Sequence, residues 1–208
     1  MNGPPTRREI RRQEREQAIL DVARESFLKE GYAATSMSAI AGALGGSKTT
    51  LWSYFPSKEA LFAAVLEAEI GRFREALIAT LSPSGTIEDT LRTFSTALLG
   101  KLTRPDTLRL HRIIASEVER FPEIGRIFYE RAPKQTHQRL AGYLEDAMAR
   151  GELRRADPLL AAQQLVALLQ ARVYPKRVWG VDAASNGTIA EEVEAALDTF
   201  LRAYAPER

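Results

Sequence analysis

The sequence has no cysteine, and this absence excludes several kinds of site at once. Without cysteine there is no disulfide framework, no thiolate metal site and no cysteine nucleophile. Histidine is also scarce, because only His111 and His137 occur among the 208 residues, too few for a histidine-rich metal site. The sequence therefore predicts no metal and no cofactor.

Long apolar runs and catalytic motifs are missing as well. No stretch approaches the roughly 18 apolar residues that a membrane span needs, and the N-terminus MNGPPTRREIRRQER lacks the apolar stretch of a signal peptide. The chain carries no G-x-S-x-G elbow, no phosphate-binding P-loop and no ligand-spaced histidines. We expect a cytoplasmic protein that binds no membrane and is not an enzyme.

Positive charge is concentrated at the N-terminus. Residues 1–15 hold five arginines against two glutamates, whereas residues 61–208 carry equal numbers of basic and acidic side chains. A basic arm over residues 1–13 would neutralise phosphates and could enter a minor groove beside a DNA-reading element. A solvated tail has the same composition, so both interpretations remain open.

Residues 36–61 contain two short helical patterns joined by a glycine corner. Ile40 and Leu44 share one face of the first pattern, and Leu51 and Phe55 share one face of the second. Each pattern is too short to form a stable helix alone, so both must pack against a larger element. This is the pattern of a helix-turn-helix, which reads DNA.

The corner and the outward face support this interpretation. Gly45 stands where a helix ends in a left-handed residue, and Ser47 is a preferred N-cap for the next helix. The positions that the core does not need carry Lys48, Thr49, Trp52, Ser53 and Tyr54. Amines, hydroxyls and aromatic tips at these positions reach base edges and phosphates when a helix enters the major groove. The alternative is that Trp52 and Tyr54 are ordinary core aromatics.

The rest of the chain is predicted to be helical, and no segment alternates as a strand does. The expected helices cover residues 14–30, 37–44, 48–54, 58–81, 86–102, 105–120, 122–150 with an interruption near Pro133, 157–174 and 188–204. Residues 175–187 are rich in turn formers and are expected to form a loop. The predicted fold class is all-α.

Residues 14–62 resemble the DNA-binding domain of the tetracycline repressor (TetR) family of bacterial transcription regulators. The resemblance rests on FLKEGYAATSMSAIA, ALGGSKTTLWSYF and PSKEAL, which follow one another in that order without gaps. Two further segments, SEVERFPEIGRIFYER (116–131) and RGELRRADPLLAAQQ (150–164), resemble one common subgroup of C-terminal domains in that family. The resemblance implies a homodimer with an N-terminal three-helix helix-turn-helix domain (14–62) and a C-terminal helical ligand-binding and dimerisation domain (63–208).

The resemblance also implies which residues contact DNA. The expected groove contacts are Ser38, Lys48, Thr50, Trp52 and Ser53, and the expected phosphate contacts are Tyr54 and Lys58 with help from Thr35 or Ser36. Two positions depart from the family pattern. Gly46 stands where the family usually has an apolar residue, and Trp52 stands where tyrosine is usual. The operator sequence therefore does not carry over from relatives.

The implied mechanism is release of DNA by a ligand. A two-fold dimer presents its reading helices to a near-palindromic operator at a spacing of about 34–36 Å or a multiple of it. A small molecule that favours a conformation with displaced reading heads would shift the equilibrium towards free DNA. The partners would be double-stranded DNA, a second copy of the chain and an unknown small-molecule effector.

The expected pocket and dimer residues lie in the helical remainder. The pocket candidates are Phe94, Leu98, His111, Ile114, Glu117, Phe128, Tyr129, Tyr143 and Gln170. The dimer candidates are Leu159, Leu160, Leu165, Val166, Leu168, Leu169, Val193, Leu197, Phe200 and Leu201 on the last two helices. Each of these side chains has the alternative of ordinary burial within its own chain. The alternative function is a DNA-binding protein whose C-terminal domain only dimerises or recruits a partner. An open cavity in that domain would favour the ligand-responsive repressor over this alternative.

Overall fold

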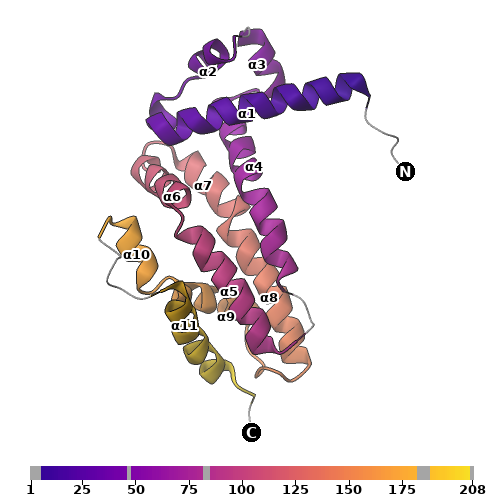
Figure 1. Cartoon of the computed structure of the whole chain (residues 1–208), viewed down its shortest axis with the longest axis vertical. Coiled ribbons are helices and arrows are strands. Elements are labelled where there is room, and N and C mark those ends of the chain that lie inside the picture. Colours follow the sequence, from indigo (N-terminus) through magenta and orange to yellow (C-terminus); the bar gives the residue numbers. More distant parts are fainter. Residues whose placement is uncertain (1–5, 46–47, 82–84, 182–187, 207–208) are drawn as a thin grey trace. The chain divides into compact units, whose positions relative to one another are not determined.

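The computed structural model describes residues 6–45, 48–81, 85–181 and 188–206, and within these ranges every regular element is a helix (Figure 1). The helices are α1 (Arg7–Ala34), α2 (Met37–Ala43), α3 (Lys48–Tyr54), α4 (Lys58–Ala79), α5 (Ile87–Leu102), α6 (Pro105–Glu117), α7 (Pro122–Arg131), α8 (Pro133–Ala149), α9 (Pro158–Leu169), α10 (Val173–Val178) and α11 (Ile189–Tyr204). In these same ranges, no helix combines the length and the apolar character that crossing a bilayer requires. The all-α fold class is confirmed.

The chain forms two compact units. The first comprises Met1–Ile70 and Ile113–Phe128, and the second comprises Gly71–Arg112 and Tyr129–Arg208. The chain passes from one unit to the other within α4, α6 and α7. The domains expected from the sequence, 14–62 and 63–208, follow chain order, whereas the first compact unit also takes in the segment from the end of α6 into α7.

An aromatic cluster fills the core of the first unit. Phe27 and Tyr32 come from α1, Phe62 comes from α4, and Phe121 lies between α6 and α7. The ring centre of Phe62 is 5.1 Å from that of Phe27 and 5.2 Å from that of Tyr32, and Phe121 is 5.2 Å from Tyr32. These contacts are edge-to-face, an arrangement in which the positive edge of one ring meets the negative face of another. The α6–α7 segment is thereby part of this core.

Helix α1 begins earlier than the sequence indicates, at Arg7 rather than near Glu14. The Thr6 hydroxyl accepts a hydrogen bond from the amide of Glu9 at 3.3 Å, and the Glu9 carboxylate accepts one from the amide of Thr6 at 2.6 Å. This reciprocal capping box satisfies two donors that a helix start otherwise leaves unpaired. Residues 7–13 of the expected basic arm are therefore helical, and residues 1–5 of that arm lie outside the described residues.

The core of the second unit is built from α5, α8, α9 and α11. Helix α8 packs on α9, and α11 packs on both α5 and α9 (Figure 1). The most deeply buried large side chains, each at most 1% exposed, are Leu91, Phe94, Leu99, Leu140, Leu144, Leu165, Leu169, Val193, Leu197 and Phe200. They recur every three to five residues along their helices, which gives each helix one apolar stripe.

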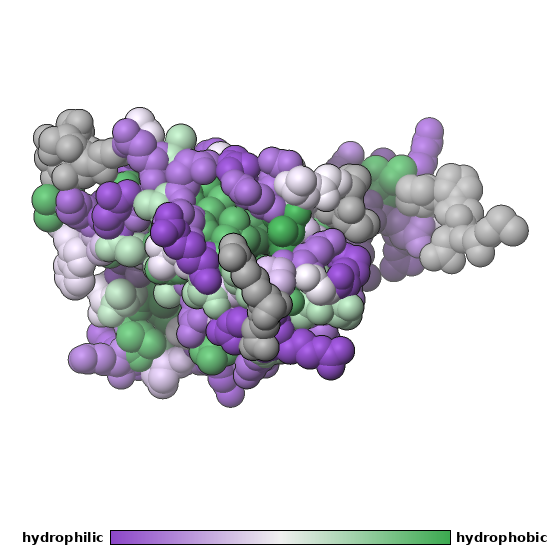
Figure 2. All heavy atoms as spheres, turned by 90° about the horizontal axis from the view of Figure 1, so that it is seen from below, coloured by the Kyte–Doolittle hydropathy of each residue, from purple (hydrophilic) through white to green (hydrophobic). Residues whose placement is uncertain are grey.

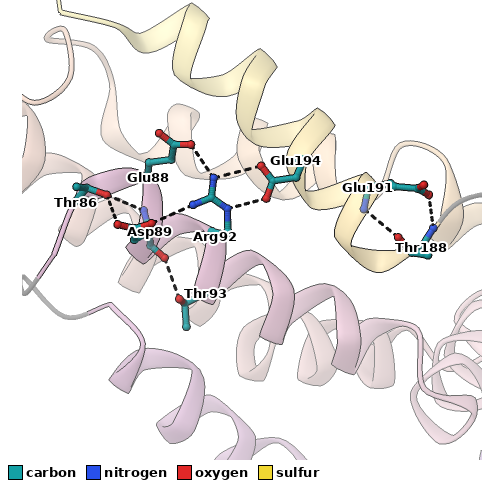
Figure 3. A network of polar contacts seen from close by, with 8 residues as sticks. All are labelled: Thr86, Glu88, Asp89, Arg92, Thr93, Thr188, Glu191 and Glu194. Atoms are coloured by element: carbon teal, nitrogen blue, oxygen red, sulfur yellow. Dashed lines mark hydrogen bonds and ion pairs between the residues drawn. The ribbon is translucent and has the colours of Figure 1, made fainter.

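An ion-pair network joins α5 to α11 at the surface of the second unit (Figure 3). The Arg92 guanidinium lies 2.7 Å from the carboxylate of Glu88 and 3.1 Å from that of Asp89, both on α5, and 2.7 Å from that of Glu194 on α11. The hydrogen bonds to Glu194 and Glu88 raise the pKa of Arg92. Nearby, the hydroxyls of Thr86 and Thr188 cap the starts of the two helices (Figure 3). These exposed pairs orient the helices more than they stabilise them.

Six of the ten dimer candidates are buried, two are exposed, and Leu168 and Leu201 are half-buried against the core of their own chain. Leu165, Val166, Leu169, Val193, Leu197 and Phe200 are buried in the core of their own chain. In contrast, Leu159 is 43% exposed and Leu160 is 48% exposed on α9. Hydrophobic residues also reach the surface between hydrophilic ones on the face shown in Figure 2. Of the ten candidates, the two exposed leucines are thus the best placed to meet another molecule.

The region after α9 differs from the expected helix 157–174 and loop 175–187. Helix α9 ends at Leu169, and a short helix α10 begins at Val173 after Arg172, whose φ of −121° is not helical. Pro175 falls in the first turn of α10, where a missing amide hydrogen costs no intrahelical hydrogen bond. The turn formers of residues 175–187 predict a loop, and α10 occupies the start of that range instead.

Candidate functional site

Helices α2 and α3 form the predicted helix-turn-helix corner in the first unit. The Ser36 hydroxyl caps α2, because it accepts a hydrogen bond from the amide of Ala39 at 3.1 Å. Gly45 has a φ of 62°, which is the left-handed conformation that the sequence predicts for it. Ile40 of α2 and Leu51 of α3 are 0% and 2% exposed, so the inward faces of the two helices are buried.

The outward face of α3 remains open to solvent. Trp52 is 48% exposed, which excludes the alternative that it is a core aromatic. The Ser53 hydroxyl donates to the carbonyl of Thr50 at 2.7 Å, and its oxygen can still accept a hydrogen bond. The predicted DNA contacts with exposed side chains are Ser36, Ser38, Lys48, Thr49, Trp52 and Ser53. Thr50 is half-buried, while Ser47 and Gly46 lie outside the described residues.

A basic stripe on α1 lies next to the end of α3. The stripe consists of Arg7, Arg8, Arg11, Arg12 and Arg15, which recur at helical spacing, and the first four have exposed side chains. The Arg12 guanidinium carbon lies 5.9 Å from the ring centre of the half-buried Tyr54. This distance permits a weak cation–π contact. The positive charge expected on an N-terminal arm is thus carried by the first turns of a helix.

Two residues expected to hold phosphates serve the fold instead. Thr35 is 1% exposed, and its hydroxyl donates to the carbonyl of Gly31 at 2.7 Å. The Lys58 ammonium donates to the carbonyls of Tyr32 at 2.8 Å, Thr35 at 3.1 Å and Ala33 at 3.5 Å. It also lies 4.3 Å from the ring centre of Tyr32. Since a lysine has three donors and all three are used here, the phosphate-holding role is corrected for both residues.

Glu117, expected to contact a ligand, instead fixes the end of α1. Its carboxylate accepts hydrogen bonds from the backbone amides of Tyr32 at 2.7 Å and Ala33 at 2.5 Å. Hydrogen bonds to an ionised acceptor are stronger than neutral ones, and here they join the end of α6 to the end of α1. We call this set of contacts, made by Gly31, Tyr32, Ala33, Lys58 and Glu117, the α1 corner.

Position 31 requires a glycine, because the Glu117 carboxylate lies close to its backbone. Its φ and ψ of 86° and 173° lie in a region that is essentially confined to glycine. A Cβ atom at this position would be 2.5 Å from Oε1 of Glu117. The sequence predicts that the helix ends at Gly31, and the kink found there agrees. The contact with Glu117 was missed, because no local pattern links residues that are 86 positions apart.

The second unit contains an open cleft of about 470 Å³ beside α6 and α10. It is lined by Thr103, Pro105, Leu108, Arg109, Arg112, Arg177, Gly180 and Val181. None of the nine predicted pocket residues lines it. Phe94 and Leu98 are core residues at 1% and 5% exposure, and Tyr143 packs against that core. Tyr129 is 49% exposed, and Gln170 is the C-cap of α9.

The remaining pocket candidates have other surroundings. Ile114 is 7% exposed and, like Phe128 and Glu117, belongs to the first unit. His111 belongs to the second unit, where its Nδ1 lies 2.7 Å from the hydroxyl of Tyr174. Burial lowers the pKa of His111 to about 4 and raises the pKa of Tyr174. The imidazole is therefore neutral near pH 7, when a buried cation would be costly.

Two family models match the chain, and together they cover most of it. Residues 19–65 match "Bacterial regulatory proteins, tetR family", and residues 89–206 match "AefR-like transcriptional repressor, C-terminal domain". The chain belongs to the TetR family of bacterial transcription regulators. The first match includes the whole α2–α3 corner, and the second includes the cleft beside α6 and α10.

Individual TetR-family relatives agree over long stretches. The structure of the "Flavonoid-responsive Regulator FrrA" is 38% identical in sequence, has a TM-score of 0.81 and is matched over 94% of this chain and 100% of its own. A TetR-family regulator from Mesorhizobium loti is 26% identical, with a TM-score of 0.78 and coverage of 97% and 100%. The Escherichia coli repressor ComR is 36% identical over 91 residues, which is 43% of each chain. The relatives are transcription regulators and not enzymes.

Proposed function

We propose that this TetR-family regulator is a cytoplasmic homodimeric repressor that a small molecule releases from a near-palindromic operator. The observation that carries the proposal is the open face of α3. Its opposite side is anchored by the buried Leu51, while Lys48, Trp52 and Ser53 face solvent at helical spacing. A large apolar side chain such as Trp52 remains exposed at a cost unless a partner covers it, and the thymine methyls of a major groove are suitable partners.

The electrostatics of the first unit support DNA as that partner. The basic stripe on α1 and the lysine at the start of α3 supply cations, and Arg12 contacts the ring of Tyr54 at the end of α3. Phosphate neutralisation by such cations provides affinity without sequence selection, whereas contacts to base edges provide the selection. We therefore assign Trp52, Lys48 and Ser53 to base reading and the stripe to the backbone of the DNA.

Dimerisation is proposed through α9 and α11. The exposed Leu159 and Leu160 are adjacent on α9, and α11 packs beside α9 within the second unit. A two-fold interface places the same patch on both copies, so the two leucines of one copy would pack against those of the other. The dimer would present two α3 helices to successive major grooves.

The relatives suggest the nature of the effector. FrrA, 38% identical over nearly the whole chain, carries the name of a flavonoid-responsive regulator. We propose that the effector of this protein is likewise a small aromatic compound. It would act by binding the DNA-free conformation more tightly than the DNA-bound one, which is how a ligand shifts a conformational equilibrium.

A binding-site selection with the purified protein tests the DNA function. Random duplexes retained by the protein should converge on a near-palindrome whose half-sites are about 10 base pairs apart or a multiple of that. Trp52→Ala should weaken operator binding by roughly tenfold or more while changing binding to unrelated DNA little. Arg8→Ala should weaken both to a similar extent and reduce the dependence of binding on salt. Retention without any preferred sequence would refute specific regulation.

A release assay on the selected operator tests the ligand response. Flavonoids and simpler phenols are added to the preformed complex, and DNA release is followed by fluorescence anisotropy. Dose-dependent release by one of these compounds supports ligand-relieved repression. If none releases the DNA while the dimer stays intact, the alternative gains support, in which the second unit only dimerises or recruits a partner.

A further inference from the structure

The cleft beside α6 and α10 lies wholly within the second unit and gathers three arginines around one hollow. Arg109 and Arg112 lie on α6, Arg177 lies on α10, and all three line the space of about 470 Å³. Like charges repel, so three guanidinium groups around one space raise its positive potential. An anion that enters the cleft would relieve this repulsion.

The donors of these arginines are only partly used. The Arg112 guanidinium donates through Nε to the carbonyl of Val178 at 2.7 Å and also to the carbonyl of Arg177. Arg177 donates to the carbonyl of Thr103 at 3.3 Å. Each guanidinium has five N–H donors, so most of them remain available. Among the described residues, no carboxylate pairs with Arg109, Arg112 or Arg177.

The carbonyl contacts hold two of the guanidinium groups in place. Arg112 is tied to the end of α10, and Arg177 is tied to Thr103, which is itself 4% exposed and hydrogen-bonded to the carbonyl of Leu99 at 2.8 Å. Donors that are fixed before a ligand arrives lose little entropy when it binds. The fixed guanidinium groups therefore favour an anion bound at a defined position over diffuse electrostatic attraction.

Part of the remaining lining of the cleft is aliphatic, beside Thr103 and Gly180. Leu108 is 6% exposed, and Pro105 and Val181 add aliphatic surface beside the arginines. A volume of about 470 Å³ falls within the range of roughly 300–1,000 Å³ that is typical of pockets for small organic ligands. An inorganic anion alone would leave this apolar surface uncovered.

We infer that this cleft binds an amphipathic organic anion, with an acidic group on the three arginines and a flat apolar body against Leu108 and Val181. Guanidinium groups hold carboxylates and other planar anions by paired hydrogen bonds, and their faces stack on aromatic rings. As a regulatory site, the cleft rests on the ligand response proposed above. Anion binding itself is measured without DNA, so failure of the site and failure of repression are distinguishable.

Isothermal titration calorimetry of the full-length protein tests the site with naphthalene-2-carboxylate as the probe. The neutral 2-naphthylmethanol and inorganic phosphate are titrated in parallel. We expect measurable binding of the carboxylate and roughly tenfold weaker binding, or less, for both controls. The alcohol lacks the anionic group, and phosphate lacks the apolar body. Failure of the carboxylate to bind would overturn the inference, as would phosphate binding equally well, which would indicate a plain anion site.

Arg109→Gln locates the binding in the cleft. It removes the guanidinium that has no hydrogen bond or ion pair among the described residues, and we expect it to weaken carboxylate binding roughly tenfold. The matched control is Arg155→Gln, which makes the same change of charge at an exposed residue of the same unit that does not line the cleft. An equal loss in both variants would show that only the overall charge matters and would overturn the assignment.

Discussion

The α1 corner and the arginine cleft use charged residues in opposite ways, although α6 contributes to both. At the corner, both oxygens of the Glu117 carboxylate accept hydrogen bonds from backbone amides, and the Lys58 ammonium donates to three backbone carbonyls. In the cleft, Arg109 has no hydrogen-bonding partner among the described residues, and the donors of Arg112 and Arg177 are only partly used. Charges that are satisfied by the backbone fix the fold, and charges that are left unsatisfied remain available to another molecule.

Gly31→Ala should break the corner with the largest effect. The new Cβ would lie 2.5 Å from Oε1 of Glu117, in a backbone conformation that only glycine adopts readily. We expect a loss of about 2–4 kcal/mol in the free energy of unfolding, measured by urea denaturation. The control is Gly42→Ala, since a Cβ there meets no atom within 4 Å and a helical glycine is replaced by a better helix former.

The double variant Gly31→Ala/Glu117→Ala sharpens the interpretation. Removing the carboxylate removes the obstacle, so the double variant should be less destabilised than the sum of the two single changes. Strict additivity would mean that the backbone conformation of Gly31, rather than its contact with Glu117, accounts for the whole effect.

Lys58→Met should have the next largest effect on the stability of the α1 corner. It keeps an unbranched side chain of similar length over the Tyr32 ring but leaves three carbonyls without their charged donor. We expect a loss of about 1–3 kcal/mol in the free energy of unfolding. The matched variant Lys29→Met, at an exposed lysine of the same unit, should stay within about 0.5 kcal/mol of the parent protein. If the two variants are equally stable, Lys58 does not hold the corner.

The helix-turn-helix and the α1 corner show what the sequence could and could not reveal. The helix-turn-helix was predictable because its signals are local. The cap at Ser36, the left-handed Gly45 and the apolar spacing of Ile40 and Leu51 all lie within 16 residues. The open face of α3 followed from the same spacing. These local signals therefore predicted both the fold of the helix-turn-helix and its candidate interface.

The roles of charged residues depended instead on distant partners. Glu117 meets the amides of residues 85 and 84 positions away, and Lys58 meets carbonyls 23–26 positions away. Nothing near either residue in the sequence distinguishes it from a surface charge. The surroundings of the pocket candidates depend on distant partners in the same way, because Phe94 and Leu98 are apolar residues that pack into the core between helices. Only the packing of the helices decides between these outcomes.

The buried His111 should produce a smaller, pH-dependent effect in the second unit. Its pKa is lowered from 6.5 to about 4 by burial, so the unfolded chain binds a proton between these values while the folded chain does not. Stability therefore falls as the pH decreases below 6.5, by about 1–2 kcal/mol between pH 7 and pH 5.

Urea denaturation at several pH values measures this effect. His111→Asn, which retains an acceptor for the Tyr174 hydroxyl, should flatten the profile between pH 7 and pH 5. His137→Asn is the control, and it should keep most of the dependence because that side chain is less deeply buried. Parallel profiles for His111→Asn and the parent protein would show that other groups cause the pH dependence.

Arg109→Gln should have the smallest effect on stability. A charge without a partner in the described structure contributes little to folding, so we expect a change within about 0.5 kcal/mol in the free energy of unfolding. Arg112→Gln should cost more, about 1–2 kcal/mol, because it leaves the carbonyls of Val178 and Arg177 without their donor. If Arg109→Gln destabilised the protein as much as Lys58→Met, Arg109 would also serve the fold. The α1 corner and the arginine cleft would then no longer differ, because the charged residues of both would stabilise the fold rather than bind a ligand.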